Sequence, residues 1–139
     1  MIRVKQIDIY KGADIYKALS DESRIRIMHL VLKNQEMCIS DLELILDFTQ
    51  TKTSRHLTYL KNIGLLKSKK VDQWVYYYIN TTYHDILNHL FSFFGKDPVL
   101  LKDITEYRTL YSNNELAIRK LHSKRSEERR VGKECILAV

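Results

Sequence analysis

The stretch that decides the fold is FTQTKTSRHLTYLKNIGLL, residues 48–66. Its apolar and small residues share one side of a helix at three- and four-residue spacing: Thr53, Leu57, Leu60 and Ile63. Thr49 is suited to cap this helix, and Gly64 is suited to end it in a left-handed conformation. The stretch therefore predicts one helix from Gln50 to about Asn62.

The opposite side of the predicted helix carries hydrogen-bonding groups: Thr51, Ser54, Arg55, Thr58 and Asn62, with Lys52 and Tyr59 at its flanks. An arginine fork matches the edge of guanine in the major groove, while hydroxyl and amide groups suit phosphates and base edges. The amino end of the helix adds free backbone N–H groups that attract phosphate. A helix face exposed only to solvent has the same pattern in isolation, so the neighbouring segments must decide.

The segments on either side favour a nucleic-acid reader. Before the helix, SDLE predicts a capping box of Ser40 and Glu43 that opens a short helix ending near Asp47, which makes a helix-turn-helix. After it, LLKSKK and WVYYYI are two short strands separated by VDQ, and they predict a β-hairpin. This hairpin, or wing, carries three basic side chains that we expect to contact DNA: Lys67, Lys69 and Lys70.

The remaining chain is predicted to be helical. Helical spacing covers 8–19 and, after an Asp21 cap, runs to about Lys33. The helix after Tyr83 is apolar over an unusually wide arc, and a last helix begins at the Asp97 cap and breaks near SNN before 116–121. The fold class is therefore mainly α with a small β-hairpin, which is a winged helix-turn-helix. We also expect a helical dimer interface, because one subunit cannot bury all of the apolar surface after Tyr83.

The composition limits the function classes. A chain of 139 residues, 45% hydrophobic and 29% charged, fits one domain, and its formal charge of +6 favours a polyanionic partner. No apolar run approaches the ~20 residues of a membrane helix, and the beginning of the chain lacks a signal-peptide core, so we expect no membrane and a cytoplasmic protein. Cys38 and Cys135 are too few for a disulfide framework. We find no catalytic motif and expect no enzyme.

The tail, residues 125–139, is set apart from the body. Its segment Arg125 to Cys135 resembles the in-frame translation of a widely used sequencing adapter, and a solvated basic tail is the alternative. We therefore expect residues 1–124 to form the DNA-binding and dimerisation domain, with residues 125–139 as adapter read-through. Leaving the tail out does not remove the excess of positive charge.

Four segments, ALSDESRIRIMHLV, EMCISDLELIL, TQTKTSRHLTYLKNIGLL and DQWVYYYI, resemble the winged-helix core of the ArsR/SmtB family of bacterial metal-responsive repressors. The resemblance covers about 18–79. It implies a homodimer paired through the first and last helices, which fits the wide apolar arc after Tyr83. It also implies DNA contacts by four residues of the second helix of the motif: Gln50, Thr51, Ser54 and Arg55.

The resemblance points to two places for sensing an inducer. Family sensors of arsenic and cadmium read ELCVCDL, whereas this chain reads EMCISDL, so Cys38 keeps one thiol position and Ser40 replaces the other. A cysteine packed as a small apolar residue is the alternative for Cys38. The family's zinc site lies on the last dimer helix, where this chain offers Asp85 and His89 after His84, at a different spacing. The inducer could be a metal, a metalloid or a thiol-reactive species, and a regulator without an inducer is a further alternative.

The combined reading is a dimeric DNA-binding transcriptional repressor, released by an inducer and bound to an inverted-repeat operator in double-stranded DNA. We expect His56, which lies beside the apolar stripe, to be a packed and hydrogen-bonded structural histidine. The alternative function is a winged-helix module that docks a protein through the apolar helix after Tyr83, with its basic face serving solubility. Loss of DNA affinity with salt, with retained preference for one site, would separate the two.

Overall fold

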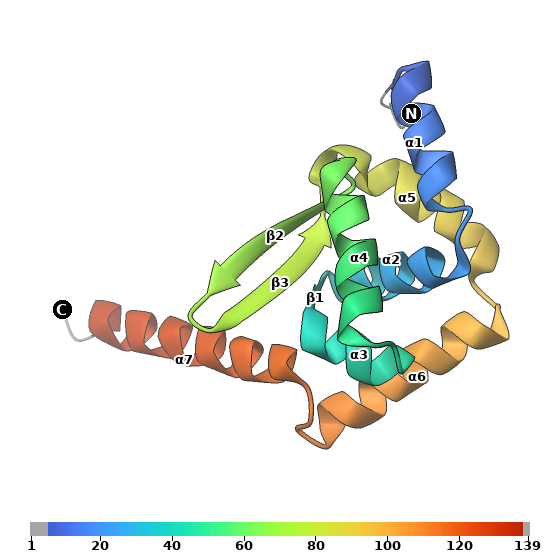
Figure 1. Ribbon diagram of the computed structural model, residues 1–139. Coiled ribbons are helices and arrows are strands. Elements are labelled where there is room, and N and C mark those ends of the chain that lie inside the picture. Colours follow the sequence, from blue (N-terminus) through green and yellow to red (C-terminus); the bar gives the residue numbers. More distant parts are fainter. Residues whose placement is uncertain (1–5, 138–139) are drawn as a thin grey trace.

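The computed structural model describes the backbone of residues 6–137 and the side chains of residues 6–128. The chain is mostly helical, with one small antiparallel sheet (Figure 1). Its elements in order are α1 (Ile9–Ala18), α2 (Glu22–Asn34), β1 (Glu36–Cys38), α3 (Ile39–Leu46), α4 (Gln50–Asn62), β2 (Leu66–Val71), β3 (Trp74–Ile79), the 3-10 turn η1 (Thr81–Tyr83), α5 (His84–Phe91), the 3-10 turn η2 (Ser92–Phe94), α6 (Pro98–Ser112) and α7 (Ala117–Leu137).

Side-chain caps fix where most of these helices begin. Asp21, Thr49 and Asp97 each accept a backbone N–H of the first turn of α2, α4 and α6, as the sequence predicts. Pro98 follows Asp97 at the start of α6, where a missing N–H costs nothing. Gly64 ends α4 with φ of 84°, a conformation that favours glycine. These local signals set the length of the second helix of the motif.

The predicted capping box of α3 is wrong. The helix begins at Ile39, so Ser40 lies inside its first turn, and no side chain caps it. Cys38 occupies the cap position with φ of −81° and ψ of 148°, because β1 keeps the chain extended up to that residue. At the other end, Asp47 adopts the left-handed conformation with φ of 56°, which turns the chain toward α4.

The wing is part of a three-stranded antiparallel sheet with the order β1-β3-β2. The predicted hairpin is present, with Leu66 opposite Ile79 and Val71 opposite Trp74. Asp72 in the turn has φ of 54°, which aspartate tolerates better than most residues. Strand β1, which no pattern in the sequence predicts, pairs Cys38 with Tyr76 and attaches the wing to the start of α3.

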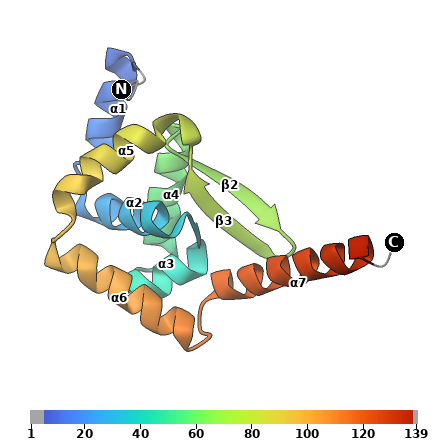
Figure 2. The same cartoon turned by 180° about the vertical axis from the view of Figure 1, so that it is seen from behind.

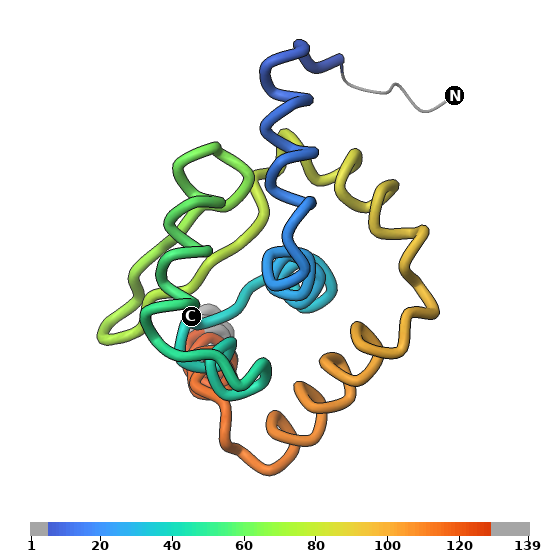
Figure 3. Tube along the Cα trace, turned by 45° about the vertical axis from the view of Figure 1, so that its right-hand side comes forward, coloured from blue at the N-terminus to red at the C-terminus, as the bar shows by residue number. Residues whose placement is uncertain are grey.

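The core lies where α2 meets α3, α4, α5 and the sheet (Figure 3). Its largest fully buried side chains come from all of these elements: Ile27, Met28, Leu30, Met37, Leu42, Leu57, Leu60, Leu65, Leu66 and Leu87. Helix α6 is joined to α2 by a bidentate ion pair in which the Arg26 guanidinium donates two hydrogen bonds of 2.9 Å to Asp103. The start of α7 is also buried in the core through Ile118 and Leu121, as is Leu116 just before it.

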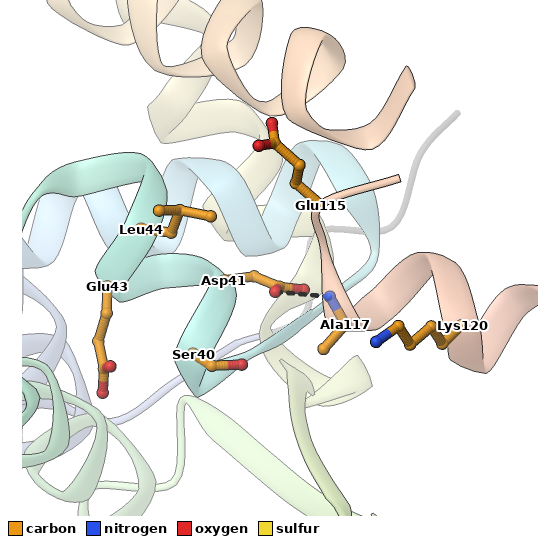
Figure 4. Close-up of a pocket in the computed structure, with 7 residues that line it drawn as sticks. All are labelled: Ser40, Asp41, Glu43, Leu44, Glu115, Ala117 and Lys120. Atoms are coloured by element: carbon orange, nitrogen blue, oxygen red, sulfur yellow. Dashed lines mark hydrogen bonds between the residues drawn. The ribbon is translucent and has the colours of Figure 1, made fainter. Parts of the chain in front are cut away.

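Helix α7 passes the tip of the wing (Figure 2). It continues without a break past residue 124, where the sequence led us to expect the end of the domain. The carboxylate of Asp41 on α3 accepts the backbone N–H groups of Ala117 and Ile118, each at 2.8 Å, and thereby caps α7 (Figure 4). Farther along, Lys124 pairs with Asp72 at the wing turn, and Arg125 pairs with Glu36 of β1. The tail proposed from the sequence thus begins inside a helix, and residues 138–139 lie outside the described part of the chain.

The apolar helix predicted after Tyr83 is divided. Helix α5 ends at Phe91, and η2 and a loop lead to α6. Large apolar side chains are exposed on α1 and at the end of this region: Ile9 at 79%, Tyr10 at 80%, Tyr16 at 71% and Phe93 at 75%. Within residues 6–137, no helix combines the length and the apolar character that crossing a membrane requires.

Candidate nucleic-acid interface

Helix α4 has one buried side and one exposed side. The side chains of Thr53, His56, Leu57 and Leu60 are at most 5% exposed and pack toward the core. The exposed side carries the residues that we call the polar face: Gln50, Thr51, Ser54, Arg55 and Thr58. Helical periodicity had selected four of these residues, Thr51, Ser54, Arg55 and Thr58, because burying the apolar stripe turns them toward solvent. Gln50 was expected there from the family resemblance. No part of the described chain covers them.

The amino end of α4 is suited to an anion. The Thr49 hydroxyl accepts the backbone N–H of Lys52 at 3.1 Å, and the Thr53 hydroxyl donates to the Thr49 carbonyl at 2.8 Å, so the first turn is well defined. No acidic residue lies in that turn, so the positive end of the helix dipole is not neutralised there. The Lys52 ammonium lies 3.9 Å from the centre of the Phe48 ring, which keeps a positive charge beside the same end.

The wing adds positive charge next to α4. Lys67, Lys69 and Lys70 on β2 are all exposed, and β2 follows directly from the end of α4 and packs against it. Lys67 and Lys69 point to one side of the strand and Lys70 to the other, because successive residues of a strand alternate. The hairpin projects from the body beside α4 (Figure 1). The polar face and the wing together form a basic surface shaped as a helix with an adjoining β-ribbon.

His56 does not belong to the polar face. Its ring is 5% exposed, and burial lowers its pKa, partly offset by the nearby Asp21 carboxylate. The burial of His56 is as the sequence predicts. His56 therefore packs on the buried side of α4 and not on its polar face.

The residues predicted for sensing are not brought together. Cys38 is 2% exposed, and burial, with smaller contributions from Asp41 and Glu36, raises the pKa of its thiol to about 12. Asp85 and His89 lie on α5 with exposed side chains. In the part of the chain whose side chains are described, no cluster of three or more His, Cys, Asp and Glu residues could hold a metal ion. Cys38, Asp85 and His89 thus do not form one site within the described part of the chain.

Several contacts that support α4 were not predicted. The Arg24 guanidinium of α2 lies 4.4 Å from the centre of the Tyr59 ring and donates to the Ala18 carbonyl at 2.9 Å. The Lys11 ammonium of α1 donates to the carbonyl of Ile63 at the carboxyl end of α4. The Arg24–Tyr59 and Lys11–Ile63 partners are far apart in sequence, and no local pattern of one chain reveals such pairs.

A helix-turn-helix followed by a β-hairpin, with its second helix exposed along a polar face, defines the winged helix-turn-helix class. Residues 21–68 match the family model described as "Bacterial regulatory protein, arsR family". This chain belongs to that family. The match covers α2 to the start of β2 and includes the whole helix-turn-helix.

Two curated relatives show the extent of the similarity. The arsenic resistance transcriptional regulator ArsR2 of Pseudomonas putida is 42% identical over 67 residues, which cover 48% of this chain and 58% of that protein. The uncharacterised HTH-type transcriptional regulator MJ1325 of Methanocaldococcus jannaschii is 38% identical over 69 residues, which cover 50% of this chain and 78% of that protein. The similarity to each relative thus extends over about half of this chain.

A solved structure shows the same fold. The homodimeric winged helix-turn-helix DNA-binding domain Mb0332 from Mycobacterium bovis, a possible ArsR-family transcriptional regulator, superposes with a TM-score of 0.56 and 22% identity. The superposition covers 70% of this chain and 94% of that domain. At this identity, the likeness concerns the fold.

Proposed function

We propose that this chain is a transcriptional regulator of the ArsR type that binds double-stranded DNA through α4 and the wing. The observation that carries the proposal is the polar face. It places a guanidinium, an amide and three hydroxyl groups on one exposed side of the second helix of a helix-turn-helix. Gln50, Thr51, Ser54 and Arg55 would reach base edges, while Lys52 and Thr58 flank them, and Lys67, Lys69 and Lys70 would contact the backbone.

The regulator acts as a homodimer in the cytoplasm. Ile9, Tyr10 and Tyr16 expose most of their surface on α1, and a groove between α1 and α5 is lined by Ile86 and Leu90. Covering this apolar surface with a second copy would remove it from water. A symmetric pair presents two copies of α4 to major grooves about 34 Å apart, which favours an inverted-repeat operator.

We further propose that the regulator is a repressor released by an inducer that shifts the dimer away from its DNA-competent state. The exposed Asp85 and His89 could form a site only with ligands from elsewhere, such as the partner subunit. Cys38 could ligate a soft metal only after the thiol loses its proton, which its raised pKa opposes. A metal at α5 therefore has better access than one at Cys38.

A salt titration tests DNA binding directly. Wild-type protein is titrated with a duplex that it selects from a randomised pool and with a shuffled duplex of the same composition, across a range of salt concentrations. The proposal expects affinity to fall steeply with salt on both duplexes while the preference for the selected duplex persists. A weak salt dependence without preference would instead favour a protein-docking module.

Two single substitutions test the roles of the helix and the wing. Arg55→Ala should remove about 1–3 kcal/mol of discrimination between the selected and shuffled duplexes, the usual contribution of a bidentate arginine–guanine contact. Lys69→Ala should weaken binding to both duplexes alike and lower the salt slope by about one unit. Equal losses on both duplexes from both substitutions would contradict this division of roles.

A further inference from the structure

The carboxyl end of α4 is held by groups from two distant parts of the chain. The Lys11 ammonium of α1 donates to the Ile63 carbonyl, which no residue of the helix can satisfy. The side-chain amide of Asn80, just after the wing, donates to the Gly64 carbonyl at 2.9 Å, and the Asn80 backbone N–H donates to the Leu65 carbonyl at 2.9 Å. The amino end of α4, in contrast, is capped locally by Thr49.

Lys11 is placed for an electrostatic role. Its ammonium lies at the negative end of the α4 dipole, 5.3 Å from the centre of the Tyr83 ring and 3.9 Å from the Asp14 carboxylate. The side chain is 24% exposed, so water screens it only in part.

Helix α1 also carries the exposed apolar side chains Ile9, Tyr10 and Tyr16. Figure 3 shows α1 beside the connection from α4 to β2. Lys11 is thus a direct link from the helix that would contact a second subunit to the helix that would enter the groove. The link spans 52 residues of sequence.

We propose that Lys11 is a positioning residue that fixes the carboxyl end of α4 relative to α1, and thereby sets the spacing of the two half-sites that a dimer recognises. This inference rests on the proposed function. Without Lys11, α4 is still capped at Thr49 and still packed through Leu57 and Leu60, so the fold remains while the tilt of the helix is less defined. When the tilt of α4 is less defined, a smaller fraction of dimers holds its two α4 helices at the distance that one half-site spacing requires.

The test uses Lys11→Met, with Lys17→Met as a control that removes the same charge from an exposed position of the same helix. Each protein is titrated with the duplex that wild type selects from a randomised pool, and with duplexes whose half-sites are moved a base pair closer or farther apart. For the selected spacing, Lys11→Met should lose affinity by about fivefold, which corresponds to about 1 kcal/mol. It should also lose the preference for that spacing, remain dimeric by analytical ultracentrifugation, and be rescued by Lys11→Arg.

If Lys11→Met has the same affinity and the same spacing preference as Lys17→Met, the inference about Lys11 is overturned. The proposal that the protein binds DNA is not affected by that result. An equal loss on every spacing, or dissociation into monomers, would also overturn it. If Lys11→Met does not fold, the shorter and neutral Lys11→Gln carries the same expectation, and failure of both to fold would assign Lys11 to stability alone. Wild-type protein that prefers no duplex would refute the proposed function itself.

Discussion

Arg26→Met and Asp103→Leu each remove one partner of the ion pair between α2 and α6, and their costs should differ. The Asp103 side chain is 3% exposed, whereas the Arg26 side chain is 28% exposed. Without Arg26, the Asp103 carboxylate loses two hydrogen bonds of 2.9 Å and stays buried. Without Asp103, the Arg26 guanidinium can turn toward water. Removing Arg26 therefore destabilises the fold more than removing Asp103 does, because it leaves a buried carboxylate without a partner.

The magnitudes follow from this asymmetry. Arg26→Met should lower the free energy of unfolding by about 3 kcal/mol, the lower end of the range for an uncompensated buried charge. Asp103→Leu should cost about 1 kcal/mol, because the remaining charge regains water. The double variant should also cost only about 1 kcal/mol, since no buried charge is left without a partner.

Urea unfolding followed by far-ultraviolet circular dichroism measures all three variants against wild type. An unchanged dependence of the free energy on urea would show that the same surface is exposed on unfolding in each. Equal costs for the two single variants, or a double variant whose cost is the sum of both, would refute the reasoning from burial.

Three further predictions concern buried groups. Burial lowers the pKa of His29 and of His56 from 6.5, so their contribution to stability is present above that pH and is lost as the pH falls below it. The urea midpoint of the wild-type protein should therefore drop on acidification, and it should drop less in His29→Leu. A urea midpoint that does not change with pH would contradict this prediction. In a Cys135→Ser variant, Cys38 should resist a thiol reagent at neutral pH until denaturant is added, and fast labelling of the native protein would contradict its pKa of about 12. Asp41→Asn should cost about 1–2 kcal/mol by weakening the cap of α7, whereas Ser40→Ala should cost almost nothing; a larger cost for Ser40→Ala would restore the capping box.

Much of the winged helix could be predicted because its signals are local. The Thr49 cap, the buried stripe of α4 and Gly64 define one helix within a short stretch, and burying that stripe fixes which side chains remain outside. Alternation and aromatic residues likewise predict the hairpin. The exposure of Arg55 and its neighbours follows from periodicity alone.

The missed features depend on pairing across long stretches of chain. Strand β1 is only three residues long and exists because β3 pairs with it. That pairing keeps Cys38 extended and moves the start of α3 ahead of Ser40, which is why the predicted capping box fails. The Arg26–Asp103 pair and the Lys11 contact likewise join residues that no local pattern connects.

The central claim is that the polar face of α4 lies against a duplex. Nuclear magnetic resonance of uniformly labelled protein tests it, by following backbone amide signals during titration with the selected duplex. We predict that the largest shifts fall on Gln50, Thr51, Ser54 and Arg55 and on the β2 lysines. Unmoved signals along α4, with the changes confined to α1 and α5, would contradict it.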